Sequence, residues 1–458
     1  MAEEVIFSGQ SQVQPQDGSL SVEQREKTSF NSFPILKILL GLLVLFVVLF
    51  VIFVLIVPRF IGGKQKVTLT YWGLFEDSQV VGPVIQDFER ENPNIHVDYV
   101  REDIKQYKER LLTRIKNGTG PDVFTFHNTW YSMLSSVLLP LPESTIGKGE
   151  FTKYFYPVAS RDLIKNGAIY GIPLEIDTLA LYINSDMFQK AGLNPPSDWN
   201  AFLTDAKTLT VKDQNGKIQT SGAALGSFDN ITHAPDIISL LMLQNGTSLE
   251  NISGTSKRAS DALNFYTSFA LPGANVWDST LDPSIVAFER GKLAMYFGYS
   301  WDFFLIKAQN SNLNFSIVKV PQLPGANVTL ASYWADGVSL KSKNQKEALL
   351  FMKFLSRKDT EEKLYAQESK IRFFGEPYAR VDLGDKLKDN PNVYPFVSQG
   401  KDAFSSFFAS DTYDDGLNSQ MNAYLGNSIN SILNQTSPDT ALTTLSQGVS
   451  QVLQQYGK

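Results

Sequence analysis

The chain has 458 residues, a formal net charge of −6, 12% aromatic residues and no cysteine. The absence of cysteine excludes disulfides and thiolate metal sites, and the mild acidity argues against a nucleic-acid partner. The histidines, His96, His127 and His233, form neither an H-E-x-x-H motif nor a pair at helical spacing, so we expect no metal and no cofactor. The roughly 390 residues from Val67 onward are too many for one typical core and predict two lobes.

One uncharged apolar run, from Ile38 to Val57, holds 20 residues. A helix of that length spans about 30 Å, the thickness of the hydrocarbon core of a bilayer. The run is longer than the apolar region of a signal peptide, and no A-x-A-like cleavage site follows it, so we expect a retained anchor within residues 33–60. A buried core helix is the alternative, but such helices are shorter and usually carry a polar face. The lipid bilayer is thus an expected partner through residues 38–57.

Basic residues do not orient this anchor. The positive-inside rule compares Lys and Arg near the two ends, and the counts are equal: Arg25, Lys27 and Lys37 before the run, and Arg59, Lys64 and Lys66 after it. Residues 1–32 are rich in Gln, Ser and Glu and predict a disordered tail, which we place in the cytoplasm. We therefore expect a single-pass cell-membrane protein whose large domain is extracellular or periplasmic.

The first part of the large domain alternates between the periodicities of strands and helices. The predicted elements are, in chain order, a strand at 67–72, a helix at 80–92, a strand at 95–100, a helix at 107–117 and a strand at 122–126. Gly118 follows the second helix as its C-terminal stop. This rhythm predicts a parallel sheet with right-handed crossovers.

The later part begins with an extended run, 168–184, that is long enough to pass from one lobe to the other. The elements predicted beyond it are helices at 199–209, 236–244, 257–270 and 346–356, a short helix from 283 that stops at Gly291 and leads to a strand ending at 297, a strand at 315–320 and a C-terminal helix from 439. Ser197 is the expected N-cap of the helix at 199–209. Ser437, followed by Pro438, is the expected N-cap of the last helix.

Short motifs in a specific order connect these elements. They are Thr70-Tyr-Trp72, Phe88-Glu-Arg-Glu-Asn-Pro-Asn-Ile95, Gly118-Thr-Gly-Pro-Asp-Val-Phe124, the run from Tyr170 to Asn184, Met187-Phe188, Pro195-Pro-Ser-Asp-Trp199, Phe288-Glu-Arg-Gly-Lys-Leu-Ala-Met295, Gly298-Tyr-Ser-Trp301, Asp336-Gly337, Lys346-Glu-Ala348 and Phe354-Leu355. Each motif alone is weak, but together they span nearly all of residues 67–458. On this basis the chain resembles the extracellular solute-binding proteins of ABC importers, specifically the maltose-binding-like, sugar-binding class.

The resemblance implies a two-lobed α/β periplasmic-binding-protein fold, type II-like, with a hinge and one preceding transmembrane helix. Mapped onto this chain, it implies a first lobe at 66–180 plus 320–358 and a second lobe at 181–319 plus 359–458. It also implies crossings between the lobes near 179–182, near 318–320 and after 356. Such lobes close around a ligand held between them. The family usually carries a cleaved signal or a lipidated cysteine, whereas this chain keeps a helix.

A sugar site needs flat aromatic platforms and planar hydrogen-bonding groups, and open sheets hold them on loops after strands. In the first lobe the candidates after the first strand are Trp72, as a platform, and Asp77. After the third strand they are Asn128 and Trp130. Three of these candidates have a structural alternative: helix packing for the two tryptophans, and a favourable position at a helix N-terminus for Asp77.

Further candidates lie beside the hinge and in the second lobe. Glu175 and Asp177 are two residues apart on an extended segment, so they share one face and either form a polar rim of the cleft or an exposed charged strand. Trp301, together with Tyr299, matches the stacking aromatic of the family's second lobe.

Four more candidates come from later parts of the chain. Trp334 and Asp336 are expected on a loop before a strand of the first lobe. Arg372 and Phe374 follow the third crossing and are expected to close the cleft.

The function that the resemblance implies is capture of a sugar or oligosaccharide by hinge closure and delivery to the permease subunits of an ABC importer, without catalysis. A ligand sensor or adhesion module built on the same trap is one alternative. A glycosidase is another, with Glu175 and Asp177 or Asp414 and Asp415 as its carboxylates, but acids adjacent in sequence are a poor sign of a pair placed across a glycosidic bond. The surplus of aromatic residues and the lack of a Gly-rich phosphate cradle favour a sugar over phosphate, peptide or metal ligands.

Overall fold

A computed structural model of the chain describes residues 33–55, 66–273 and 275–457. They belong to two compact units, residues 1–65 and 66–458. In the first unit, α1 (Phe33–Leu55) contains an 18-residue stretch of mean hydropathy 3.2, long and apolar enough to cross a membrane. The predicted tail at 1–32 and the last residues of the predicted anchor, 56–60, lie outside the described residues.

The lobe that contains the first strands, here lobe 1, is built on a five-stranded sheet. Its strand order is β2 (Ile95–Arg101), β1 (Val67–Gly73), β3 (Val123–His127), β14 (Trp334–Val338) and β6 (Ile172–Pro173). As predicted, β1 runs parallel to both β2 and β3, but β14 and β6 add antiparallel pairs, so the sheet is mixed. The difference arises because β14 enters this sheet from a segment two hundred residues further along the chain, rather than through a strand–helix–strand crossover.

Helices and short elements complete lobe 1 around this sheet. They are α3 (Ser78–Glu91), α4 (Tyr107–Lys116), α5 (Tyr131–Leu134), α6 (Lys148–Tyr154), α7 (Pro157–Leu163), α14 (Gln345–Leu355) and α15 (Lys358–Glu368), with η1 (Asn128–Trp130) and the hairpin β4 (Ile164–Lys165) and β5 (Ala168–Ile169) beside them. Phe351 of α14 lies at the centre, with its ring 4.9 Å from that of Phe88 and 5.6 Å from that of Tyr71. Gly118 ends α4 with a φ of +71°, as predicted.

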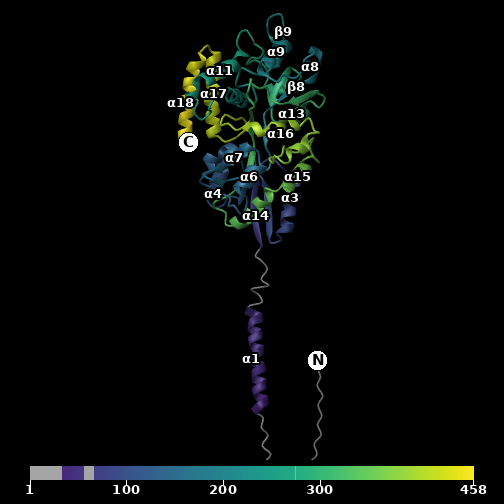
Figure 1. The fold of residues 1–458 in the computed structure, drawn as a ribbon, viewed down its shortest axis with the longest axis vertical. Coiled ribbons are helices and arrows are strands. Elements are labelled where there is room, and N and C mark those ends of the chain that lie inside the picture. The colour runs from purple at the N-terminus through teal and green to yellow at the C-terminus, as the bar shows by residue number, and fades with distance from the viewer. Residues whose placement is uncertain (1–32, 56–65, 274, 458) are drawn as a thin grey trace, which may run out of the picture. The chain divides into compact units, whose positions relative to one another are not determined.

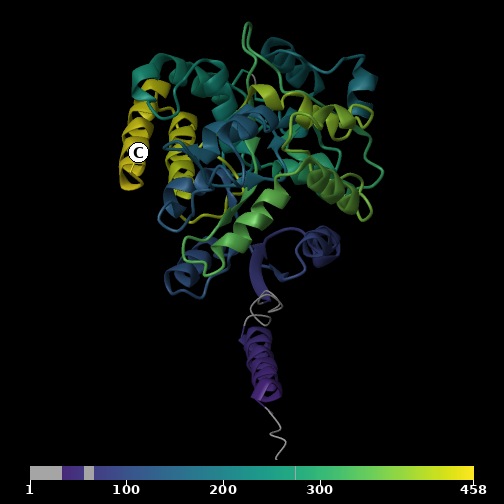
Figure 2. The same ribbon diagram turned by 60° about the horizontal axis from the view of Figure 1, so that its bottom comes forward.

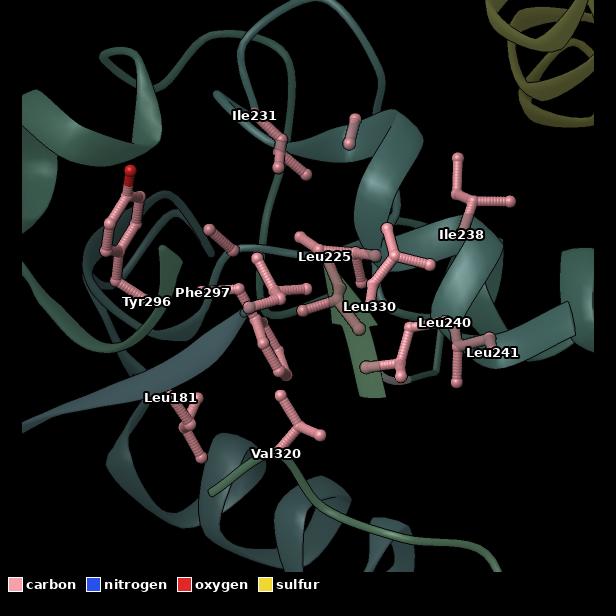
Figure 3. Close-up of a cluster of buried hydrophobic side chains, with 14 of the residues drawn as sticks. Leu181, Leu225, Ile231, Ile238, Leu240, Leu241, Tyr296, Phe297, Val320 and Leu330 are labelled. Atoms are coloured by element: carbon pink, nitrogen blue, oxygen red, sulfur yellow. The ribbon is translucent and has the colours of Figure 1, made fainter. Parts of the chain in front are cut away.

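The other lobe, lobe 2, has its own five-stranded sheet. Its order is β12 (Phe315–Val318), β8 (Ala180–Asn184), β11 (Leu293–Gly298), β10 (Ile218–Ala223) and β9 (Val211–Lys212). Every residue of β8 and β11 is buried. The sequences of these strands are therefore mostly apolar at consecutive positions and do not alternate between apolar and polar residues. Figure 3 shows part of this core, where Leu181 and Phe297 from the sheet lie close to Leu225 and Val320.

The helices of lobe 2 are α8 (Ser185–Ala191), α9 (Trp199–Leu209), α10 (Ala234–Gln244), α11 (Ser256–Ser268), α12 (Ser284–Glu289), α13 (Ser300–Gln309), α17 (Leu417–Leu433) and α18 (Pro438–Gln455), with η2 (Ser253–Thr255). Figures 1 and 2 both show α17 and α18 side by side. Ser437 caps α18 as predicted, by accepting a hydrogen bond from the Thr440 amide. The predicted cap of α9 is wrong by one residue: Asp198, not Ser197, accepts from the amides of residues 200 and 201. A carboxylate at this position has the added benefit of the helix dipole.

Extended segments connect the lobes. A small sheet of order β15 (Ala403–Phe404), β13 (Thr329–Ser332) and β7 (Asp177–Thr178) contains two of them, and η3 (Gly384–Leu387), α16 (Tyr394–Ser398) and η4 (Gly400–Asp402) lie nearby. Along β7 the chain leaves the core of lobe 1 at Ile176 and enters that of lobe 2 at Leu179. Along β13 it returns between Leu330 and Ala331, which is later than the crossing expected near 318–320.

The third crossing also comes later than the sequence implies, and the chain touches the core of lobe 1 again at Ala379 and Ala403 before it ends in lobe 2. Helix α15 packs on α3, and its Leu364 belongs to the core of lobe 1, although the mapping places residues 359–458 in lobe 2. Phe374 is the first residue after α15 that belongs to the core of lobe 2. Figure 1 shows α3, α14 and α15 together in one group, apart from α8, α9 and α13.

The packing of α14 gives a direct test of the lobe 1 core. Phe351→Ala should lower the free energy of unfolding by about 3–5 kcal/mol, because it removes a fully buried ring and leaves a cavity. Leu350→Ala, on the same helix but 42% exposed, is the matched control and should cost less than about 1 kcal/mol. Urea unfolding of the full chain in detergent measures both values. Equal losses for the two variants would contradict the assignment of this helix face to the core.

Candidate functional site

A cleft of about 560 Å³ lies between the two lobes. Residues of lobe 1 that line it come from the ends of β1, β3 and β14, and residues of lobe 2 come mainly from α13 and the segment before α17. The carboxyl ends of parallel strands meet at this edge, where open α/β sheets bind ligands. A more open hollow of about 700 Å³ beside α9 has no aromatic side chain in its wall; it is lined by Ser197, Asp198, Asn200, Ala201, Thr204 and residues 322–326. The cleft between the lobes is therefore the better candidate site.

Trp301 provides an aromatic surface on the lobe 2 side of the cleft. Its ring stacks on that of Tyr299, with centroids 4.5 Å apart and planes 16° apart. Tyr299 is fully buried, and its hydroxyl donates a hydrogen bond of 2.8 Å to Oδ1 of Asp236. Tyr299 thus does not line the cleft itself but fixes the orientation of the ring that does.

A charged pair lies beneath this platform. Nε2 of His233 lies 2.8 Å from Oδ2 of Asp302, and its Nδ1 lies 2.7 Å from Oγ of Ser410. Burial lowers the pKa of His233, but the carboxylates of Asp302, Asp411 and Asp236 outweigh burial and raise the pKa to about 9. The imidazolium is therefore charged at neutral pH and stabilises the carboxylates behind the aromatic wall.

Trp334 provides the corresponding surface on lobe 1. It lies on β14 rather than on the expected loop. Its ring makes edge contacts with Trp130 and with Phe75, both at 5.2 Å between centroids, and with His127 at 5.1 Å. Trp130 is fully buried behind it, whereas Phe75 is 47% exposed and lines the cleft. Trp130 therefore supports the site from behind, and Phe75 belongs to its surface.

Two buried aspartates line the cleft. Asp336, on β14 and not on a loop, accepts a hydrogen bond of 2.6 Å from Oγ1 of Thr125, and burial raises its pKa to about 6. Asp177 accepts from the backbone amide of Ser300 at 2.7 Å and from that of Thr178 at 2.8 Å. Because Ser300 is the first residue of α13, Asp177 connects the crossing strand β7 to the N-terminus of a helix in lobe 2.

Four glutamates and one arginine form what we call the glutamate cluster: Glu76, Glu175, Glu368, Glu376 and Arg372, all of which line the cleft. The guanidinium of Arg372 lies 3.0 Å from Glu76, 3.1 Å from Glu368 and 3.2 Å from Glu376. Burial, and then the neighbouring carboxylates, raise the pKa of Glu175 well above its ordinary value. Burial likewise raises the pKa of Glu368 to about 8, against the opposing effect of Arg372.

The structure brings together half of the predicted site residues and places the others outside the cleft. The residues that line the cleft are Glu175, Asp177, Trp301, Trp334, Asp336 and Arg372. Besides Tyr299 and Trp130, which support platforms from behind, four others lie elsewhere: Trp72, Asp77, Asn128 and Phe374.

Each of these four has a structural role. Trp72 packs on Tyr107 of α4, since side chains alternate along β1 and Tyr71 faces the cleft instead. Asp77 is exposed and pairs with Arg101. Asn128 is buried and donates to Asp162.

Phe374, the last of the four, is buried against Phe303 and Phe304, with centroids 5.0 and 4.7 Å apart. Its burial in the core of lobe 2 leaves the neighbouring Arg372 as the member of this segment that reaches the cleft.

The sequence reasoning missed several residues of the cleft wall: Phe75, Glu76, Tyr99, Glu368, Glu376, Asp411 and Tyr413. Phe75 and Glu76 follow the first predicted strand closely. Ligand contacts are expected on loops after strands, so this position was a signal that could have found them. Asp411 and Tyr413 adopt positive φ values of 53° and 50° on an irregular segment, and no sequence pattern pointed to them. Glu368 reaches the cleft only because α15 packs on lobe 1.

Comparison with known proteins identifies a family for this chain. Residues 74–362 match the family described as bacterial extracellular solute-binding protein. The multiple sugar-binding protein of Streptococcus mutans serotype c is 24% identical over 331 residues, which cover 66% of this chain and 74% of the relative. A putative binding protein of Brucella abortus (strain 2308) is 26% identical over 314 residues, which cover 64% of this chain and 73% of the relative.

Solved structures share the fold. A cyclo/maltodextrin-binding protein complexed with maltotetraose superimposes with a TM-score of 0.70 at 20% identity, covering 86% of this chain and 98% of that chain. An ABC transporter solute-binding protein from Thermotoga lettingae, bound with alpha-D-tagatose, gives a TM-score of 0.64 at 21% identity, covering 84% of this chain and 99% of that chain. These likenesses confirm the two-lobed α/β fold. The chain therefore belongs to the family of bacterial extracellular solute-binding proteins, as its motifs imply.

Proposed function

We propose that the protein captures a sugar or oligosaccharide between its lobes and delivers it to the permease of an ABC importer. The observation that carries this proposal is the pair of tryptophans that line one cleft from opposite lobes, Trp301 on α13 and Trp334 on β14. Flat aromatic rings suit the apolar faces of sugar rings, and the carboxylates between them accept hydrogen bonds from hydroxyls. The names of the relatives, which include a multiple sugar-binding protein and a complex with maltotetraose, support the same ligand class.

The proposed mechanism is closure of the lobes without covalent chemistry. Because Trp301 and Trp334 belong to different lobes, a ligand that contacts both stabilises the closed arrangement over the open one. The crossing strands β7 and β13 are the expected hinges, since each passes from one core to the other within a few residues. A micromolar dissociation constant would correspond to about 8 kcal/mol of binding free energy. The proposed ligand contacts are Glu175, Asp177, Trp301, Trp334, Asp336 and Arg372, with Tyr299 as a positioning residue.

The proposal includes a membrane anchor. Helix α1 is uncharged from Ile38 onward and carries exposed Leu, Val, Ile and Phe side chains, which a bilayer would cover. Retention by α1 would keep the binding unit close to a permease in the same membrane. This would replace the release or lipid attachment that is usual in the family.

The ligand class can be tested by thermal shift of the full chain in detergent against a panel of sugars, amino acids and peptides. A sugar at about 100 times its dissociation constant should raise the free energy of unfolding by roughly 2.7 kcal/mol. Trp301→Ala should then weaken binding of that sugar about 30-fold or more, a loss of about 2 kcal/mol, because it removes the stacking surface. Isothermal titration calorimetry measures the affinities.

Trp72→Ala is the matched control for the platform, since Trp72 is also a partly buried tryptophan but packs on α4 outside the cleft. It should lower stability and leave the sugar affinity unchanged. A peptide or amino acid that shifts the unfolding temperature while sugars do not would overturn the sugar assignment. Equal affinities in the wild type and Trp301→Ala would overturn the platform.

The glutamate cluster predicts how stability depends on pH. The pKa of Glu368 rises from an ordinary value of 4.5 to about 8 in the folded protein, because burial outweighs the opposing effect of Arg372, and the carboxylates of Glu376 and Glu76 add to the rise. A raised carboxyl pKa gives stability that is present at low pH and lost as the pH rises through the folded value. The ligand-free protein should therefore lose part of its stability between about pH 5 and pH 8.

Glu368→Gln isolates this contribution, since Gln keeps the size of the side chain and cannot ionise. The unfolding temperature of this variant should fall less steeply across the same pH range. Thermal unfolding of both proteins in a pH series is the measurement, and identical slopes would contradict the raised pKa.

The anchor has a separate test. The full chain expressed in a bacterium should stay with the membrane fraction after an alkaline carbonate wash, and deletion of residues 33–55 should release it. Helix α1 offers a continuous apolar surface for the bilayer, so removal of that surface should abolish retention. Recovery of the intact full chain in the soluble fraction would contradict the anchor, and recovery of a shortened chain would indicate cleavage after this helix.

A further inference from the structure

Exposed apolar side chains gather around the cleft. Outside α1, nine large apolar side chains are exposed among the described residues. Five of these nine line the cleft or flank its Arg372 in the chain: Phe75, Leu305, Ile371, Phe373 and Tyr413. Single exposed apolar residues are ordinary on a protein surface, but their concentration in one place marks a surface that binds an apolar group.

The apolar surface continues inside the cleft as what we call the aliphatic wall. It consists of aliphatic side chains on α3, α14 and α15 of lobe 1 and on α12 and α13 of lobe 2. They are Val81, Val84, Ile285, Leu305, Leu355 and Leu364. Aliphatic side chains have no flat π face, so they cannot serve as stacking platforms for sugar rings as tryptophans can.

Two hydroxyl groups on the lobe 1 side of the cleft use their protons within the protein. The hydroxyl of Tyr99 donates a hydrogen bond of 2.6 Å to the backbone carbonyl of Glu76. Oγ1 of Thr360, on α15, donates one of 2.8 Å to the carbonyl of Phe354. These donors are therefore already engaged, and the part of lobe 1 around α3 and α15 offers a ligand mainly apolar contacts.

Arg372 shows that the apolar parts of the two lobes meet. Its guanidinium lies 5.3 Å from the ring centroid of Phe304 on α13, and 3.0 Å from Glu76, just before α3. The cleft-lining face of α13, which carries Phe304 and Leu305, therefore lies close to the start of α3. A ligand group that enters here has apolar side chains from both lobes around it.

A sugar alone does not match such surroundings. A hydroxyl that is placed against an aliphatic side chain loses its hydration and gains no hydrogen bond, which costs free energy. An apolar group in the same place gains free energy, because both it and the wall are removed from water. The cleft thus combines aromatic platforms for a sugar with a separate surface for an apolar group.

We propose that the solute is a glycoside with an apolar aglycone, whose sugar contacts Trp301 and Trp334 and whose aglycone packs on the aliphatic wall. This inference rests on the proposed function for the sugar part and on the aliphatic wall for the aglycone. The cleft volume of about 560 Å³ must hold both parts, which favours an aglycone of about the size of one aromatic ring.

The test compares the methyl and phenyl β-glycosides of glucose, galactose and mannose, with benzyl alcohol as an apolar probe without a sugar. Calorimetry uses the full chain in a detergent without a sugar headgroup, because alkyl glycoside detergents are themselves glycosides with apolar aglycones. For at least one sugar, the phenyl glycoside should bind about tenfold or more tightly than the methyl glycoside, since its ring is buried on the aliphatic wall.

Leu305→Asn tests where the aglycone lies. Leu305 is 52% exposed, so its replacement should leave the fold intact, and the phenyl-to-methyl affinity ratio should fall at least about threefold. Leu350→Asn is the matched control: Leu350 is 42% exposed on α14 and does not line the cleft, so the ratio should stay the same.

The outcomes separate the two proposals. If methyl and phenyl glycosides bind equally tightly, the aglycone inference is overturned and the sugar assignment stands. If benzyl alcohol binds as tightly as the phenyl glycosides, the sugar assignment is overturned and the apolar site stands. If none of the six glycosides binds at millimolar concentration, the aglycone inference is overturned, and the sugar panel decides the sugar assignment separately. A phenyl preference that Leu305→Asn leaves unchanged would overturn the placement of the aglycone on the aliphatic wall.

Discussion

The structure depends on one constraint: the chain builds two separate hydrophobic cores and joins them by short extended segments. The change of core takes place between Ile176 and Leu179 on one segment and between Leu330 and Ala331 on another. Each core is close-packed and resists deformation, whereas a strand of two to four residues has little to hold it rigid. The surfaces that face each other across the junction therefore cannot merge into one core, and they remain as a cleft.

This separation explains the burial of so many ionisable groups in the cleft. The cleft floor is made of strand ends and hinge segments, so polar side chains such as Asp177 and Asp336 are shielded from water and still line a cavity. Their charges are stabilised by different means, a helix N-terminus for Asp177 and a hydroxyl for Asp336. Burial raises the pKa of Asp177, Glu175 and Glu368 alike; the neighbouring carboxylates add to the rise at Glu175, and Arg372 opposes it at Glu368. Such raised pKa values are common where a protein binds ligands.

Aromatic residues in this protein act in layers. Trp301 and Trp334 face the cleft, and a second ring stands behind each of them: Tyr299 by stacking and Trp130 by an edge contact. The second layer is fully buried, and Tyr299 is fixed further by Asp236. A ring held in this way loses little conformational entropy when a ligand stacks on it, which favours binding. The 12% aromatic content of the chain therefore includes buried rings that hold the cleft-facing rings in place as well as the rings that line the cleft.

The sequence by itself determined the elements and the family. Apolar periodicity gave the strands at β1, β2 and β3 and the helices between them, because these patterns follow directly from which face of each element is buried. The motifs implied the two-lobed fold, and the family resemblance pointed to Trp301, which lines the cleft. The sequence does not decide which residue at the end of a strand faces the cleft: it favours Trp72, whereas Tyr71 lines the cleft. It also could not place α15 on lobe 1 or bring Glu368, Glu175 and Glu76 together, since these residues are far apart in the chain. Contacts of this kind depend on how the lobes are packed, which no local pattern encodes, and only the tertiary structure decided them.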